Sequence, residues 1–103
     1  MPFHVHPADA PLFEAVLTRS VHDAASMAES LEQHSLQPVA ELAHRIVGAL
    51  GAFGLTQVAA AAGALERACR HGDRAQARQC LDELEGLLRE TRASMGPNEN
   101  PVP

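Results

Sequence analysis

The chain contains no lysine, tryptophan or tyrosine, and only three phenylalanines and two cysteines occur among its 103 residues. Aromatic and β-branched residues, which favour strands, are scarce, whereas alanine and other good helix formers are common. This composition favours an all-α fold. A chain of this length suits one domain with a single hydrophobic core. It leaves no room for a nucleotide-binding catalytic domain beside another unit.

Without lysine, the positive charge rests on eight scattered arginines, and the formal net charge is −5. A nucleic-acid interface needs clustered basic residues that contact phosphates, so this distribution argues against nucleic acid as a partner. No stretch approaches about 18 uninterrupted apolar residues, and the N-terminal segment lacks the basic and apolar regions of a signal peptide. We therefore expect no direct membrane insertion and a cytoplasmic location.

Cys69 and Cys80 are the two cysteines of the chain. Since the sequence shows no secretory signal, we expect reduced thiols rather than a disulfide. The spacing of the cysteines and histidines matches no zinc-ligand motif, so we expect no metal site.

Apolar residues recur at intervals of three and four along most of the chain, which predicts amphipathic helices. One helix is expected over about residues 36–53, a second from Thr56 to about residue 70, and a third from Asp73 onward. Residues 9–34 form either one bent helix or two. Short polar residues that can cap a helix N-terminus stand before or within these stretches: Asp9, Ser20, Ser35 and Asp73.

The connections between these helices are short, so consecutive helices should pack antiparallel. We therefore predict an all-α, up-down four-helix bundle with a short additional N-terminal helix. The bundle domain is expected to span residues 9–94. Residues 1–8 and 95–103 are expected to be flexible termini, because the C-terminal segment is rich in proline and asparagine and has almost no large apolar residues. Gly54 and Gly72 are placed to end helices in a left-handed conformation.

His44 lies in the apolar segment ELAHRIVGALGAFG, residues 41–54, which contains three glycines after it. At about 100° per residue, His44 lies roughly 200° from the core residue Leu42, on the exposed side of its helix. Residues three, four or seven positions away from His44 lie on the same side of the helix. They are Ala40 and Glu41 before it, and Val47, Gly48 and Gly51 after it.

Glycine costs a helix interior roughly 0.5–1 kcal/mol relative to alanine, so the two glycines on the side of His44 need an explanation. Bare backbone beside the imidazole would let the surface of a second protein come close to it. The alternative explanation is close packing between helices within the chain.

The segment AHRIVGALGAFGL, residues 43–55, resembles the signature of the histidine-containing phosphotransfer (HPt) domain of bacterial two-component phosphorelays. That signature is a histidine, a leucine two positions later, then lysine and glycine, and a second glycine six positions after the first. Here the segment supplies His44, Ile46 in place of the leucine, Gly48, Gly51 and Gly54. The segment AAGALERACRHGD, residues 61–73, resembles the end of the family's next helix, and the similarity covers about residues 9–94.

The resemblance implies that Nε2 of His44 accepts a phosphoryl group from an aspartyl phosphate on a response-regulator receiver domain and passes it to another receiver. It implies a phosphate carrier without an ATP site of its own rather than an enzyme. The implied partners are receiver domains and a hybrid sensor histidine kinase. Mg²⁺ is expected on the receiver, with no cofactor on this chain. The chain is expected to be either a free-standing protein or the cytoplasmic C-terminal domain of a membrane-bound sensor kinase.

The resemblance also suggests supporting residues. Glu66, on the helix after that of His44, is expected to hold Nδ1 of the ring, with a simply solvated side chain as the alternative. Arg70 either lies near a bound phosphate or pairs with Glu66 at i+4. Arg45 is a partial substitute for the family's lysine, whose position is taken by Val47.

Two further groups of residues are candidates for a docking surface. Glu41 and Val47 are expected to contact a partner beside His44. Leu12, Val16 and Met27 are candidates from the early helices, with a place in the core as the alternative. The loss of the lysine at Val47 favours a second function, that of a non-phosphorylated HPt-like helical interaction module or scaffold.

Overall fold

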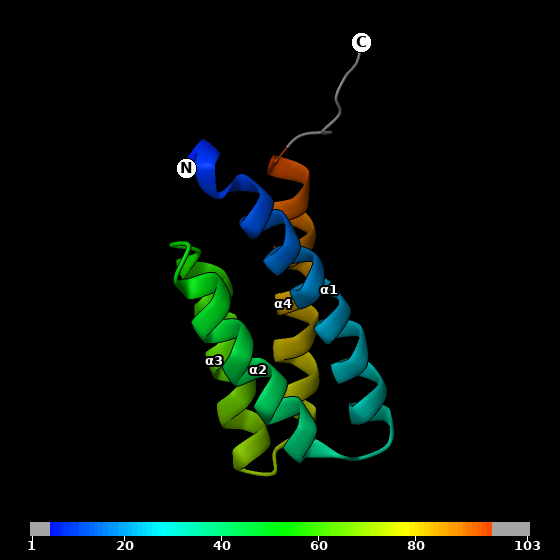
Figure 1. Ribbon diagram of the computed structural model, residues 1–103. Coiled ribbons are helices and arrows are strands. Elements are labelled where there is room, and N and C mark those ends of the chain that lie inside the picture. The colour runs from blue at the N-terminus through cyan, green and yellow to red at the C-terminus, as the bar shows by residue number, and fades with distance from the viewer. Residues whose placement is uncertain (1–4, 96–103) are drawn as a thin grey trace.

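The computed structural model describes residues 5–95, and they form an antiparallel bundle of four α-helices (Figure 1). The elements follow in the order η1 (Pro7–Asp9, a 3-10 helix), α1 (Ala10–Glu32), α2 (Leu36–Gly51), α3 (Thr56–Arg70) and α4 (Arg74–Ser94). The predicted all-α class and four-helix bundle are confirmed. The short N-terminal helix is the single turn η1, and residues 9–34 contain one continuous helix. The predicted flexible termini fall largely on residues 1–4 and 96–103, which lie outside the described residues.

Two of the predicted helix ends form by backbone geometry that glycine permits. Gly54 has φ 85°, and beside it the N–H of Leu55 donates to the carbonyl of Leu50 at 3.2 Å. Gly72 has φ 73° and ends α3 in the same way. Asp73 then caps α4, because its side chain accepts a hydrogen bond from the N–H of Gln76 at 3.0 Å.

The other predicted caps differ from the structure. Asp9 and Ser35 occupy the N-cap positions of α1 and α2, but neither side chain makes a capping hydrogen bond. Ser20 starts no helix: it is buried within α1, and its hydroxyl donates to the carbonyl of Val16 at 2.9 Å. That hydrogen bond satisfies the hydroxyl inside the helix, so the chain needs no break there.

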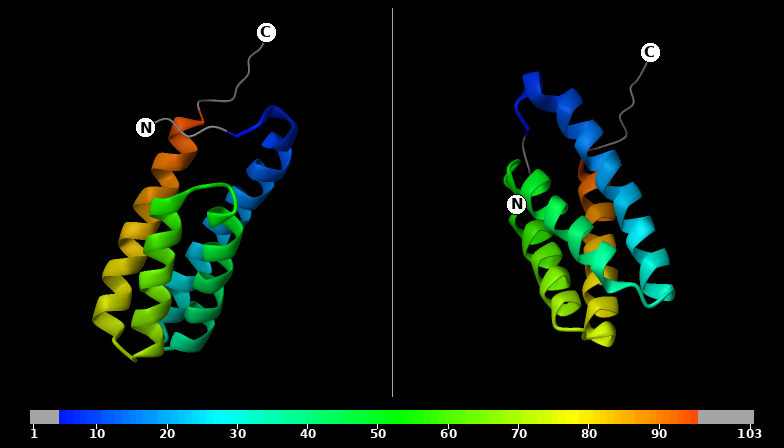
Figure 2. Two further views of the ribbon diagram at one scale, coloured as in Figure 1. Left: turned by 90° about the vertical axis from the view of Figure 1, so that its left-hand side faces the viewer. Right: turned by 60° about the horizontal axis from the view of Figure 1, so that its bottom comes forward.

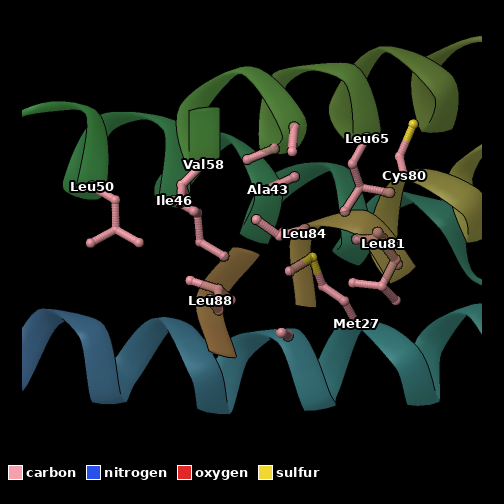
Figure 3. Close-up of a cluster of buried hydrophobic side chains, with 14 of the residues drawn as sticks. Met27, Ala43, Ile46, Leu50, Val58, Leu65, Cys80, Leu81, Leu84 and Leu88 are labelled. Atoms are coloured by element: carbon pink, nitrogen blue, oxygen red, sulfur yellow. The ribbon is translucent and has the colours of Figure 1, made fainter. Parts of the chain in front are cut away.

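The core lies along the axis of the bundle and is lined by aliphatic side chains from all four helices (Figure 3). Leu17, Ile46, Leu65 and Leu84 are examples, one from each helix, and each is at most 1% exposed. Cys69 and Cys80 are buried on α3 and α4 and are both free thiols, as predicted. Burial raises the pKa of the Cys69 thiol.

The helices differ in length, and this leaves α1 and α4 paired beyond the end of α2 and α3. Figures 1 and 2 show the α2–α3 connection at the same end of the bundle as the start of α1 and the end of α4. Arg92 of α4 ties this end together, because its guanidinium lies 2.6 Å from the carboxylate of Glu14 and 2.9 Å from the hydroxyl of Thr18 on α1. None of the helices in residues 5–95 is both long and apolar enough to span a bilayer.

Candidate functional site

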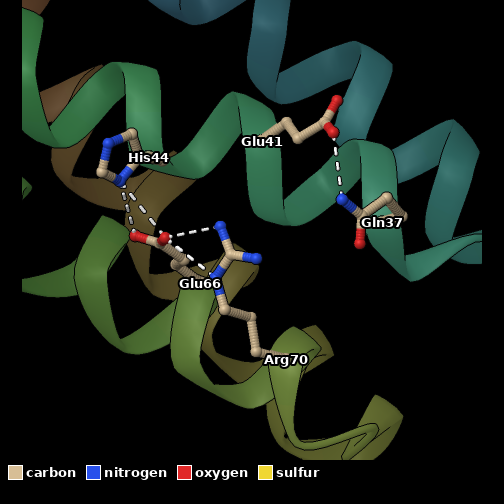
Figure 4. Close-up of polar contacts among 5 residues, drawn as sticks. All are labelled: Gln37, Glu41, His44, Glu66 and Arg70. Atoms are coloured by element: carbon tan, nitrogen blue, oxygen red, sulfur yellow. Dashed lines mark hydrogen bonds and ion pairs between the residues drawn. The ribbon is translucent and has the colours of Figure 1, made fainter.

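His44 lies near the middle of α2 and extends from the bundle, with 71% of its side chain exposed. Its neighbours Ala43 and Ile46 are buried and anchor this part of α2 to the core. The predicted exposure of His44 is therefore what the structure shows. The ring stands at the seam between α2 and α3 (Figure 4).

Glu66 of α3 faces the ring of His44, and the two residues come together as predicted. Nδ1 of His44 lies 3.2 Å from both carboxylate oxygens of Glu66. Arg70 holds the same carboxylate from the other side, because its Nε and Nη2 donate to Oε2 of Glu66 at 3.0 and 2.9 Å (Figure 4). Of the two alternatives for Arg70, the structure therefore shows the ion pair at i+4.

The charge of Glu66 determines which nitrogen of His44 carries the proton. The hydrogen bond from Arg70 is the main reason why the pKa of Glu66 lies below its ordinary value of 4.5; burial opposes this shift, and His44 adds to it. An ionised carboxylate can only accept hydrogen bonds, so Nδ1 of His44 must donate. Nε2 of a neutral ring is then left with an exposed lone pair.

Small residues let α2 and α3 come close enough for this contact. A methyl group added to Gly63 of α3 would lie 4.0 Å from Cγ2 of Val47, and one added to Gly51 of α2 would lie 3.6 Å from Cβ of Ala59. Gly63 and Ala59 precede Glu66 along α3, while Val47 and Gly51 follow His44 along α2. Val47 and Gly51 on α2 therefore face Gly63 and Ala59 on the antiparallel helix α3. We call this contact the α2–α3 seam.

Part of the side of α2 that was predicted to be exposed is instead covered at this seam. Gly51 faces α3 rather than open solvent, and Val47 is half-buried and packed against the core. Ala40 is 1% exposed. The buried arc of α2 is wider than predicted because α2 packs on both α1 and α3.

Gly48 and Glu41 do lie on the open surface beside His44. A methyl group added to Gly48 would have no atom within 4 Å, so no close packing within the chain requires this glycine. The carboxylate of Glu41 accepts a hydrogen bond from Gln37 one turn earlier, at 3.0 Å (Figure 4). Both residues are therefore accessible to a protein that covers His44.

Arg45 has a partner that the sequence analysis missed. Its Nη2 donates to both carboxylate oxygens of Asp23 on α1, at 3.2 and 3.1 Å, so this guanidinium is held on the α1 side of α2 and not beside Glu66. Asp23 is buried, although it lies in a helix whose inner face is otherwise mostly apolar. A carboxylate at such a position signals a buried ion pair, which needs a cation from a neighbouring helix.

Arg67 is a second residue that the sequence analysis missed. A methyl group on Gly63 would lie 3.5 Å from Nη1 of Arg67 and 4.0 Å from Cγ2 of Val47, so the Arg67 guanidinium lies back along α3 next to Gly63, which borders the seam with Val47. Within residues 5–95, the guanidinium of Arg67 makes no hydrogen bond or ion pair, whereas the backbone carbonyl of Arg67 is engaged by His71. The signal in the sequence is a glycine on the seam followed at i+4 by a long cationic side chain.

No set of three or more His, Cys, Asp or Glu side chains in the described part of the chain is arranged to hold a metal ion. Leu12 is 59% exposed, Val16 is half-buried, and Met27 is fully buried in the core. Of the three apolar docking candidates on α1, Met27 is therefore a core residue.

The fold and the site define a class of protein: a helical bundle that presents one oriented histidine on its surface. The family model for the Hpt domain matches residues 11–94, and the chain belongs to this family. Membership implies a histidine phosphotransfer role in phosphorelays, as a carrier without an ATP site of its own, in contact with receiver domains and kinases. A search of curated proteins and a search of solved structures each gave no match.

Proposed function

We propose that this chain carries a phosphoryl group on Nε2 of His44, taking it from the aspartyl phosphate of one receiver domain and giving it to the aspartate of another. The observation that supports this most directly is the contact between Nδ1 of His44 and the Glu66 carboxylate, at 3.2 Å from each oxygen. This contact leaves Nε2 as the exposed nucleophile.

The transfer needs no acid or base beyond these groups. The lone pair of Nε2 attacks phosphorus, the N–P bond forms, and the bond from phosphorus to the aspartyl oxygen breaks, so that the receiver regains its carboxylate. The Nδ1 proton stays on the ring, which gains positive charge. Glu66 stabilises that charge through a hydrogen bond that already exists before the reaction.

Positioning and electrostatics dominate phosphoryl transfer, because its transition state is loose. We infer that the receiver supplies Mg²⁺ and most of the charged groups. This chain supplies an oriented nucleophile, beside which the helix backbone at Gly48 is not covered by a side chain. A hybrid sensor kinase is the expected upstream source of the phosphoryl group, and the cytoplasm is the expected location.

The test is phosphorylation of the purified chain by labelled receiver domains in the presence of Mg²⁺. Wild type should take up label that is lost in acid and retained in alkali, and phosphorus–nitrogen coupling in NMR spectra should place the group on Nε2. His44→Gln should take up none while keeping the helical circular dichroism spectrum. Label on His44→Gln would contradict the assignment of His44.

His22 gives a matched control, because it is an exposed histidine on α1, whereas Glu66 lies on α3. His22→Gln should be labelled as well as wild type. If wild type accepts no phosphate from any receiver of its source organism, the scaffold function replaces the carrier function. Val47 in place of lysine is the feature that favours that second candidate.

A further inference from the structure

A hollow of about 320 Å³ opens between α1 and α2, and its lining includes Arg45, the residue after His44. Apolar atoms of Val16, Ile46 and two alanines line it, and Arg19 and Arg45 stand among them. Arg45 directly follows His44 along α2, and Ala49, another lining residue, directly follows Gly48. A protein large enough to cover His44 and Gly48 would therefore also reach this hollow.

Asp23 fixes the two arginines at the hollow. Its carboxylate is 7% exposed and lies 3.1 Å from Nη2 of Arg45 and 3.7 Å from Nε of Arg19. A buried carboxylate is costly without cationic partners, so Asp23 holds the two guanidinium groups in place.

This cluster carries an excess of positive charge. Two guanidinium groups surround one carboxylate, whereas the chain as a whole carries a net charge of −5. The side chains of Arg19 and Arg45 are 62% and 50% exposed, and within residues 5–95 each makes hydrogen bonds or ion pairs only with Asp23. Their remaining N–H groups are available to a partner, and the planar guanidinium fork suits a carboxylate.

We infer that the hollow selects the receiver domain that exchanges phosphate with His44, by taking an apolar side chain between Val16 and Ile46 and pairing Arg19 and Arg45 with an adjacent Asp or Glu of the receiver. This inference rests on the proposed function and specifies the chemistry of the partner's surface. The apolar lining supplies contact area, and the two arginines reject a surface that is basic at that point.

Two substitutions test the two halves of the inference. Arg19→Gln removes one cation and leaves the Arg45–Asp23 pair, so the buried carboxylate keeps its closest partner. Ala15→Leu, at an exposed alanine that lines the hollow, fills the hollow without changing charge. Matched controls are Arg89→Gln, an exposed arginine of α4, and Ala60→Leu, an exposed alanine of α3.

The probe is a receiver domain that labels wild-type His44, activated with beryllofluoride and Mg²⁺, and its Kd is measured by calorimetry. We expect Arg19→Gln to raise Kd by about 3- to 10-fold and to reduce the dependence of Kd on salt. Ala15→Leu should raise Kd by about 10-fold or more, since a filled hollow excludes the partner's side chain. The controls should stay within about 2-fold of wild type.

Transfer rates from the phosphorylated receiver are measured in parallel and divided by the rate at which phosphoramidate, a small phosphodonor, labels His44. This ratio separates docking from the reactivity of the ring. Circular dichroism and thermal unfolding check that each variant folds.

An unchanged Kd for both Arg19→Gln and Ala15→Leu, with a receiver that labels wild type, would overturn this inference and leave the proposed function standing. If wild type self-associates in sedimentation, and Arg19→Gln and Ala15→Leu lose this self-association but bind the receiver as wild type does, the inference would also be overturned. The hollow would then be assigned to a second copy of the chain. Failure of wild type to accept phosphate from every receiver would overturn the proposed function, and this inference with it.

Discussion

At the scale of single residues, Gly48 is the position whose identity the packing of the chain itself explains least. It lies in the interior of α2, one turn after His44, and a methyl group there would meet no atom within 4 Å. Alanine would fit here without strain, and it would lower the conformational entropy of the unfolded chain, which favours the folded state. We propose that the glycine is there because the surface of a partner approaches the backbone at this point.

Gly48→Ala should therefore separate stability from transfer. We expect the free energy of unfolding to rise by about 0.5–1 kcal/mol, while phosphoryl transfer from a receiver slows. Chemical denaturation and labelling kinetics measure the two effects. Gly86→Ala, within α4, is the matched control and should leave the transfer rate as in wild type. A transfer rate for Gly48→Ala equal to that of wild type would show that the cleared backbone is not needed.

We propose that Arg67, whose guanidinium lies at the α2–α3 seam without a partner in residues 5–95, meets the charge of a phosphoryl group on His44. Arg70 is paired with Glu66 and Arg45 with Asp23, whereas the guanidinium of Arg67 lies next to Gly63 at the α2–α3 seam. Arg67→Gln should lower the fraction of His44 that is phosphorylated at steady state by about 3- to 10-fold, because one charge-assisted contact is lost. Quantitative labelling compares it with Arg89→Gln, and equal labelling of the two variants would exclude this role.

At the scale of elements, the connection between α1 and α2 holds a residue in an unfavourable conformation. His34 has φ 60°, the left-handed region that glycine adopts at Gly54 and Gly72. The N–H of Ser35 donates to the carbonyl of Ser30 at 2.9 Å, so this helix end has the same form as the other two.

His34→Gly should stabilise the protein, because glycine adopts the left-handed conformation without the steric cost of a Cβ atom. We expect a rise of about 0.5–1 kcal/mol in the free energy of unfolding, measured with urea. His34→Ala should give no such gain, since alanine keeps the Cβ atom. A loss of stability in the glycine variant would mean that the His34 side chain stabilises the folded protein by more than the left-handed backbone conformation destabilises it.

Local chemistry explains which of these elements could be predicted from sequence. Gly54, Gly72 and Asp73 act through their immediate neighbours, and the predictions for all three are confirmed. The left-handed position of His34 carries no glycine to signal it. Ser20 looked like a cap because the sequence does not show that its hydroxyl bonds back to Val16 within a continuing helix.

The same limit applies to the site. Helical periodicity was sufficient to place His44 on the surface, and the resemblance to the family placed Glu66 opposite it. Periodicity alone cannot say which neighbouring helix borders an exposed side, so Gly51 and Val47 were expected in the open and instead lie on the α2–α3 seam. The Asp23–Arg45 pair joins two helices, and its partners are 22 residues apart in sequence.

At the scale of the whole molecule, protonation of Glu66 makes the free energy of unfolding depend on pH. Hydrogen bonds from Arg70 are the main cause that lowers the pKa of Glu66 in the folded protein, and the unfolded chain lacks them. In acid the unfolded chain therefore binds a proton at Glu66 more readily than the folded protein does. The stabilisation is complete above the ordinary pKa of 4.5 that Glu66 has in the unfolded chain, and it is lost as the pH falls through the lower pKa of the folded protein.

Glu66→Gln removes this titration and nearly preserves the shape of the side chain. The difference in unfolding free energy between wild type and Glu66→Gln, from urea denaturation, should be larger at pH 5.5 than at pH 3. Arg70→Gln removes the main cause of the shift, so the effect of Glu66→Gln measured in that background should vary less with pH. If the difference instead stayed constant or grew toward acid, Arg70 would not be holding the Glu66 carboxylate ionised. The Glu66 carboxylate would then not fix the Nδ1 proton of His44.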